Sequence, residues 1–161
     1  MSDRKETTKI LTEAVIRHIN PKNDTRIYYA TEVTFDYATA HSIRVDVVQY
    51  KPGNMDKPGG IEKGKVYCFE VKSCIEDYKS GHGLNYIGDF NYIVTLPEVF
   101  EKIKEDLKWT PVGVYVYENN KLVCARKAKE CDRNYSISEI LLMMFRSANR
   151  ENIKHRKEKA V

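Results

Sequence analysis

Two strand-like segments joined by a stretch of turn formers constrain the fold of this chain most strongly. Residues 43–50 form an apolar run rich in β-branched side chains. Residues 65–73 place Val66, Cys68, Glu70 and Lys72 on one face and Tyr67, Phe69 and Val71 on the other, which is the period of a strand. Between them, residues 51–64 contain two prolines and four glycines, a density that indicates a loop. The two strands are therefore predicted to be neighbours joined by a long loop.

The other elements follow from the same periodicities. Apolar residues recur at helical spacing, strands alternate, and Ser136 with Glu139 forms a capping-box pattern. The predicted order is helix 7–19, strand 27–35, strand 43–50, strand 65–73, a broken segment 76–85 with at most a short helix, strand 91–96, helix 97–108, a hairpin of strands 113–117 and 121–126, and a last helix from 136. This order predicts an α/β fold with a central mixed sheet flanked by helices.

Length and composition bound the class of protein. The chain has 161 residues, of which 42% are hydrophobic and 31% charged, which suits a single domain over residues 1–150 and a basic tail over 151–161. No run of about 18 apolar residues is present, so a membrane protein is excluded. The charged start of the sequence has no apolar core of a secretory signal, and the protein is expected in the cytoplasm.

The four cysteines do not predict a metal site. They stand at positions 68, 74, 124 and 131, and no pair has the Cys-x-x-Cys spacing of a structural zinc or redox site. We expect free, reduced thiols, in agreement with a cytoplasmic protein.

The net charge of +4 is concentrated at one end of the sequence. Residues 146–161 contain six Lys or Arg and two Glu residues, which accounts for the whole excess. A neutral body with a basic tail favours binding of a polyanion such as nucleic acid, while a solvated helix explains the charge equally well.

Two of the predicted strands carry charges that suggest chemistry. Asp46 stands inside the β-branched run, where a buried charge is costly without a partner. Glu70 and Lys72 are two positions apart, so both leave the same face of their strand. If the strands pair, Asp46 and Glu70 offer hard oxygen ligands to Mg²⁺ or Mn²⁺. Lys72 would then orient or activate a metal-bound water for phosphodiester hydrolysis. The alternative is a surface ion pair that contributes less than about 1 kcal/mol.

These residues resemble the PD-(D/E)XK nuclease superfamily, in which an aspartate and a Glu-x-Lys lie on adjacent strands of an αβββαβ core. The element order over residues 7–96 is similar to that restriction-endonuclease-like core, although Val45 stands where the family name has proline. Within the superfamily the chain resembles the MmcB-like DNA-repair group and uncharacterised phage and prophage proteins. That likeness is carried by Glu32, residues 44–46, residues 70–73, residues 77–79, residues 79–85 and residues 143–150.

The resemblance implies a metal-dependent nuclease that acts on DNA, with RNA as the alternative substrate, in repair, recombination or phage nucleic-acid processing. It implies Asp46, Glu70, Lys72 and Glu32 as catalytic residues, and Glu13 is the other candidate for the fourth acid. The expected nucleic-acid contacts are Arg44, Lys79, His82, Asn85, Arg146 and Arg150. The alternative function is a non-catalytic nucleic-acid-binding or regulatory module with the same fold, and a homodimer is left open.

Overall fold

The computed structural model describes residues 2–36 and 38–160 of the chain. The described elements are α1 (Ser2–Ile19), β1 (Tyr28–Phe35), β2 (Ile43–Lys51), β3 (Lys65–Lys72), α2 (Ile75–Lys79), β4 (Phe90–Thr95), α3 (Pro97–Ile103), β5 (Gly113–Glu118), β6 (Lys121–Arg126) and α4 (Ile137–Lys159). The predicted α/β architecture with a mixed sheet flanked by helices is confirmed. Among the described helices, none has the length and apolar character needed to cross a membrane.

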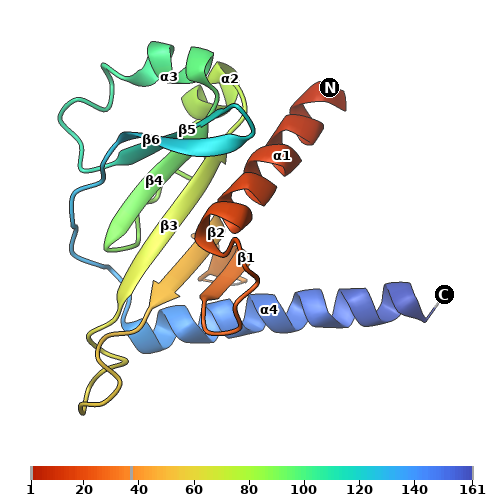
Figure 1. Ribbon diagram of the computed structural model, residues 1–161, viewed down its shortest axis with the longest axis vertical. Helices are drawn as coiled ribbons and strands as arrows, with labels where there is room; N and C mark the ends of the chain where they lie inside the picture. Colours follow the sequence, from red (N-terminus) through yellow and green to blue (C-terminus); the bar gives the residue numbers. More distant parts are fainter. Residues whose placement is uncertain (1, 37, 161) are drawn as a thin grey trace.

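The six strands form one sheet in sequence order, β1-β2-β3-β4-β5-β6 (Figure 1). The pairs β1–β2, β2–β3 and β5–β6 are antiparallel, whereas β3–β4 and β4–β5 are parallel. Each parallel step needs a crossover connection, which α2 with its following loop and α3 supply. The hairpin between β5 and β6 turns at Asn119 and Asn120, whose φ values of 51° and 61° suit a tight two-residue turn.

The helices cover the two faces of the sheet unequally. Leu11, Ala14 and Val15 of α1 pack on Val47 and Phe69 of one face. The opposite face is covered in two parts, because α3 packs on the β4–β5 half and α4 on the β1–β3 half. The result is a three-layer arrangement in which β3 is buried from both sides.

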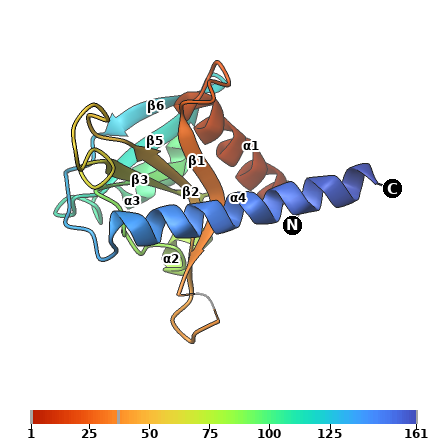
Figure 2. The ribbon, with the colours of Figure 1, turned by 90° about the horizontal axis from the view of Figure 1, so that it is seen from below.

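Helix α4 extends well past the sheet that it covers (Figures 1 and 2). The predicted capping box at its start is confirmed, since the Ser136 hydroxyl accepts from the Glu139 amide and the Glu139 carboxylate accepts from the Ser136 amide. Ile140 and Met144 are buried against the sheet, while residues 152–160 are exposed. The basic tail is thus the exposed C-terminal part of helix α4.

Strand β1 is distorted at Glu32, whose φ is 49°. Ala30 and Val33 are three positions apart yet pack in the same cluster under α4, so the strand exchanges its faces at this point. Helix α4 supports the distortion, because Ser147 donates to the carbonyl of Thr31 and Arg150 donates to that of Glu32 at 2.9 Å.

Helix boundaries differ from prediction at two places. Helix α1 begins at Ser2 rather than residue 7, and the hydroxyls of Thr7 and Thr8 donate to carbonyls one turn earlier, which supports that first turn. Helix α3 ends at Ile103 rather than residue 108, and the chain continues in turns that still bury Leu107. In the second case the apolar spacing correctly identified buried residues but not the backbone conformation.

Candidate catalytic site

The neighbouring strands β2 and β3 bring three of the four predicted catalytic residues together. The paired residues of β2 and β3 end at Val47 and Phe69, and Asp46 and Glu70 are the next residues along the two strands beyond that pair. Asp46, Glu70 and Lys72 all line one cavity of about 740 Å³, which the beginning of α1 and the loop after α2 also border.

Asp46 is fixed by the backbone of the neighbouring strand. Its Oδ2 accepts a hydrogen bond from the amide of Val71 at 2.8 Å. Burial raises the pKa of Asp46, while the Val71 amide and the nearby Lys72 ammonium act in the opposite direction. The carboxylate is therefore oriented into the cavity in an environment that disfavours its charge.

Glu70 lies in a still less favourable environment for a charge. It is 8% exposed, and its Oε2 atom has no hydrogen-bond partner among the described residues. Burial, together with the neighbouring Asp46 carboxylate, raises the pKa of Glu70 to about 8 despite the opposing influence of Lys72. The neighbouring positive charge therefore does not compensate fully for ionisation of both carboxylates.

Lys72 is the buried cation of this cavity, with 2% of its surface exposed. Its Nζ lies 3.4 Å from Oε1 of Glu70 and donates a hydrogen bond to the carbonyl oxygen of His82. A buried ammonium held by two oxygen atoms has a defined position, which is what a group acting on a reacting phosphate or water requires.

The loop after α2 lies directly against the carboxylate of Glu70. Gly83 has a φ of +79°, and a β-carbon built on it would stand 1.6 Å from Oε1 of Glu70. A glycine is therefore required here for both backbone conformation and space. The loop brings His82 and Asn85, two of the predicted nucleic-acid contacts, to the cavity wall.

The structure adds a carboxylate and a cation that the sequence analysis did not assign to the site. Asp77 of α2 lines the cavity and forms an ion pair with Arg4 of α1 at 2.8 Å. Its charge also raises the pKa of Asp46. Asp77 belongs to the segment 77–79 that carried the family resemblance, which was the available signal, whereas Arg4 is 73 positions away in sequence and gave none.

Only one of the remaining predicted site residues, Arg44, lines the catalytic cavity. Glu32 and Glu13 are exposed, and neither is among the residues that line the cavity. Arg44 does border it, but Lys79 does not. Arg146 and Arg150 lie on α4 beside a small neighbouring cavity, which shares Thr34 with the catalytic cavity. The expectation that Glu32 completes the catalytic set has no support from this geometry, because Glu32 does not line the cavity and its backbone carbonyl is bound by Arg150 of α4.

The donor set suits a cation that needs few protein ligands. Within residues 2–36 and 38–160, no group of three His, Cys, Asp or Glu side chains is placed to hold a metal ion. Mg²⁺ is commonly held by one or two carboxylates and keeps several waters. The unpartnered Oε2 of Glu70 and the adjacent Asp46 carboxylate fit that requirement, and a divalent ion would relieve their mutual repulsion.

Comparisons with known proteins establish the fold alone. No family model matches the chain, and no curated protein matches it. A solved structure, the SPO1766 protein of unknown function from Silicibacter pomeroyi, is similar with a TM-score of 0.61 and 15% sequence identity. The similarity covers 95% of this chain and 91% of that protein, so the whole arrangement of helices and sheet is shared.

Proposed function

We propose that this protein is a metal-dependent nuclease with a restriction-endonuclease-like core. The observation that carries the proposal is the joint placement of Asp46, Glu70 and Lys72 on adjacent strands, in one cavity, with an unpartnered carboxylate oxygen. The order α1-β1-β2-β3-α2-β4 and its strand directions agree with the αβββαβ core that the sequence resembles.

Each residue has a separate task in the proposed reaction. Asp46 and Glu70 would hold Mg²⁺ or Mn²⁺, which supplies Lewis-acid activation of water and phosphate when bound. Lys72 places its ammonium beside Glu70, where it stabilises negative charge that develops on the phosphate or assists a proton transfer. Arg4 and Arg44 at the cavity border favour approach of a polyanion.

DNA is the proposed substrate, with RNA as the alternative to be tested beside it. The exposed basic half of α4 projects from the body and offers sequence-independent attraction for phosphates. Attraction of this kind increases local substrate concentration without selecting a sequence. A role in repair, recombination or phage nucleic-acid processing belongs to this proposal through the family resemblance.

The test is cleavage of labelled single-stranded, duplex and branched DNA, with RNA in parallel, in the presence of Mg²⁺ or Mn²⁺. We expect cutting by the wild-type protein, no cutting by Asp46→Ala, and unchanged cutting by Glu62→Gln, an exposed glutamate in the loop between β2 and β3. Thermal melting of each variant controls for folding. If the folded wild-type protein binds these substrates and cuts none of them with either ion, the non-catalytic nucleic-acid-binding module becomes the better description.

Calorimetric titration with Mg²⁺ or Mn²⁺ tests the ligand assignment separately from cleavage. Wild type should bind the ion, and Asp46→Ala should bind it more weakly because one of two carboxylate ligands is lost. Equal binding by the two proteins would contradict this placement of the metal.

A further inference from the structure

A second cavity lies on the α1 face of the sheet, at the opposite end of β3 from Glu70 and Lys72. It has a volume of about 120 Å³ and is walled largely by rings, those of His18, Tyr67, Phe69, Tyr92 and Tyr115. Cavities that enclose a whole small-molecule ligand are larger, about 300–1,000 Å³. This one has room for a single flat group inserted from the surface.

The rings are arranged by strand pairing rather than by core packing alone. Tyr67 stacks on Phe90 with centroids 4.8 Å apart, and Phe69 stacks on Tyr92 at 5.6 Å. Tyr115 closes the row at 4.9 Å from Tyr92. Tyr67, Tyr92 and Tyr115 remain partly exposed, so an aromatic platform faces solvent beyond the end of α1.

A buried amide at this cavity lacks a partner. Gln49 is 6% exposed and lies opposite Tyr67 in the β2–β3 register. Its side chain lines the cavity and makes no hydrogen bond with any other described residue. Its carboxamide atoms are not among the fully buried polar atoms without a partner, so they are reachable through the cavity and offer both a donor and an acceptor to a ligand that enters.

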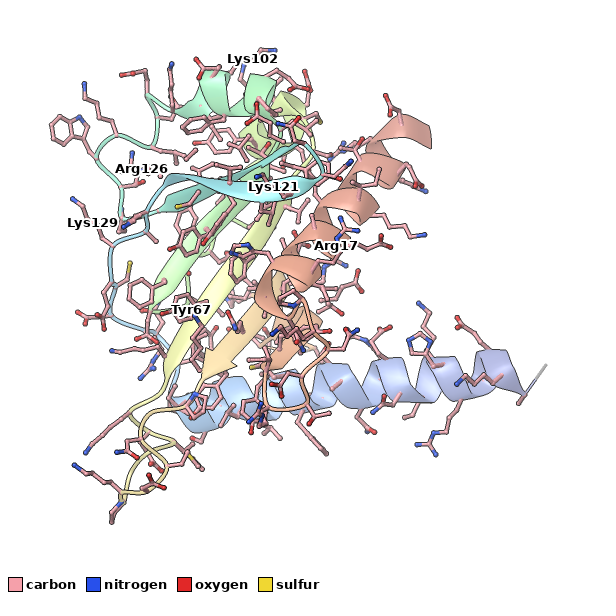
Figure 3. The ribbon with its side chains drawn as sticks, viewed as in Figure 1. Arg17, Tyr67, Lys102, Lys121, Arg126 and Lys129 are labelled. Carbon is pink, nitrogen blue, oxygen red and sulfur yellow. The ribbon has the colours of Figure 1, made fainter. Side chains whose placement is uncertain are left out.

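The rim of the cavity is positively charged. Lys51 Nζ lies over the Tyr67 ring at 4.3 Å from its centroid. The backbone of Ala128 lies near the Tyr92 hydroxyl, and the exposed Lys127 and Lys129 are its neighbours in sequence. Figure 3 looks onto this face, with Arg17 on α1 and Lys129 on opposite sides of the strand that bears Tyr67.

The carboxylates that face this region are already engaged. Asp89 and Glu130 act on Tyr67, and Lys65 lies 3.9 Å from Asp89 and also pairs with Glu130. Arg133 lies 3.1 Å from Asp89. Lys51 and Lys129 have no ion-pair partner in the part of the chain that the structure describes, so their charge is available to an anion.

We propose that this aromatic cavity binds a single-stranded polynucleotide, with one base inserted among the rings and its edge hydrogen-bonded to Gln49, while Lys51 and its neighbours contact the phosphates. Aromatic rings beside a basic rim are the combination that single-stranded binding uses, because every base has a face to stack and every nucleotide a phosphate to pair. Duplex DNA fits poorly, since its bases are already stacked on one another. The site is separate from the catalytic cavity and does not depend on cleavage.

The test is fluorescence anisotropy with labelled oligonucleotides of about eight nucleotides, a length within the usual single-stranded site size. Oligo-dT and oligo-U distinguish DNA from RNA, and an abasic strand of the same charge isolates the contribution of the bases. All titrations are done in EDTA at one salt concentration, so a failure of the nuclease proposal does not affect them.

We expect Tyr67→Leu to weaken binding about 5- to 150-fold, the range that corresponds to loss of one base–ring stack. Tyr67→Phe should retain binding because it keeps the ring, and Tyr28→Leu, an exposed tyrosine on β1, is the matched control. The abasic strand should bind more weakly than oligo-dT to wild type and equally to wild type and Tyr67→Leu.

If Tyr67→Leu does not fold, the variants Lys51→Ala and Gln49→Met test binding at the same cavity. Lys51 is exposed, so its removal should weaken binding without loss of thermal stability, while Lys57→Ala in the neighbouring loop should change less. The proposal is overturned if wild type does not bind, if it prefers duplex DNA, if the abasic strand binds as tightly as oligo-dT, or if folded variants at Tyr67 and Lys51 bind like wild type.

Discussion

The two cavities share strand β3 but differ in how their polar groups are balanced. At the carboxyl end of the strand, Glu70 and Asp46 are buried beside each other with one ammonium, that of Lys72, to offset them. At the other end, Tyr67 and Phe69 present neutral rings with the cation of Lys51 at the rim. The first cavity holds two adjacent carboxylates in a low-dielectric setting, so its properties should depend on pH and on divalent cations. The second combines ring surface with lysines at its rim, so its binding should depend on salt concentration but need no divalent ion.

The largest expected effect separates the two cavities by function. Lys72→Met keeps the aliphatic stem and removes the charge, and we expect cleavage to fall roughly 100-fold or more, the scale for one positioned electrostatic or proton-transfer group. Binding of oligo-dT in EDTA should be unchanged, because Lys72 lies outside the aromatic cavity. Normal cleavage by folded Lys72→Met would refute the role assigned to this lysine.

The pH dependence of stability should come from the charged cavity. The pKa of Glu70 is about 8 in the folded protein and near 4.5 when unfolded, so the folded state retains a proton that the unfolded state has lost between these values. The free energy of unfolding should therefore fall as pH rises from about 5 to 8, by at most about 1.4 kcal/mol per pH unit, and then level off.

Denaturant titrations of wild type and Glu70→Gln across that range measure this effect. The neutral amide cannot titrate, so the variant should lose the slope and exceed wild type in stability at high pH. Added Mg²⁺ should recover part of the wild-type loss above pH 8 by binding the ionised pair. Parallel slopes for the two proteins would exclude Glu70 as the cause.

The close approach of the loop to Glu70 can be tested by substituting two glycines that have similar backbone conformations. Gly81 and Gly83 both have positive φ, +70° and +79°, but a β-carbon on Gly81 meets nothing within 4 Å. Gly81→Ala should cost about 1 kcal/mol in unfolding free energy from backbone strain alone. Gly83→Ala should lower the unfolding free energy further, because its methyl group would displace the Glu70 carboxylate. Equal losses for the two variants would show that the loop moves away from Glu70 without cost.

The smallest effects on cleavage are expected for Asp77, which lines the catalytic cavity, and for Glu32, which does not. Asp77→Asn removes the ion pair with Arg4, whose side chain is half exposed, so the expected change in cleavage is below about fivefold, or about 1 kcal/mol. Glu32→Gln should have no measurable effect, because this residue does not line the cavity. A larger loss for Glu32→Gln than for Asp77→Asn would restore Glu32 as the fourth acid.

Much of the fold was predictable because its signals are local. The strand limits at residues 43 and 65, the hairpin at Asn119 and Asn120, and the capping box at Ser136 each depend on a few adjacent residues. The face exchange in β1 was not predictable, because the positive φ of Glu32 is stabilised by Ser147 and Arg150, more than a hundred residues later. The regular alternation predicted for β1 is therefore interrupted at Glu32.

The sequence by itself determined which side chains share a strand face, and so it placed Glu70 beside Lys72 and required a partner for Asp46. Side-chain alternation is a local property of the backbone, and it holds where the strand is regular, as between Glu70 and Lys72 of β3. Only the tertiary structure decided that Asp77 and Arg4 meet at that site, that Gly83 closes on Glu70, and that Gln49 faces a ring-lined cavity. These features arise from packing between distant segments, which sets burial and hence the cost of each charge, and no local pattern encodes it.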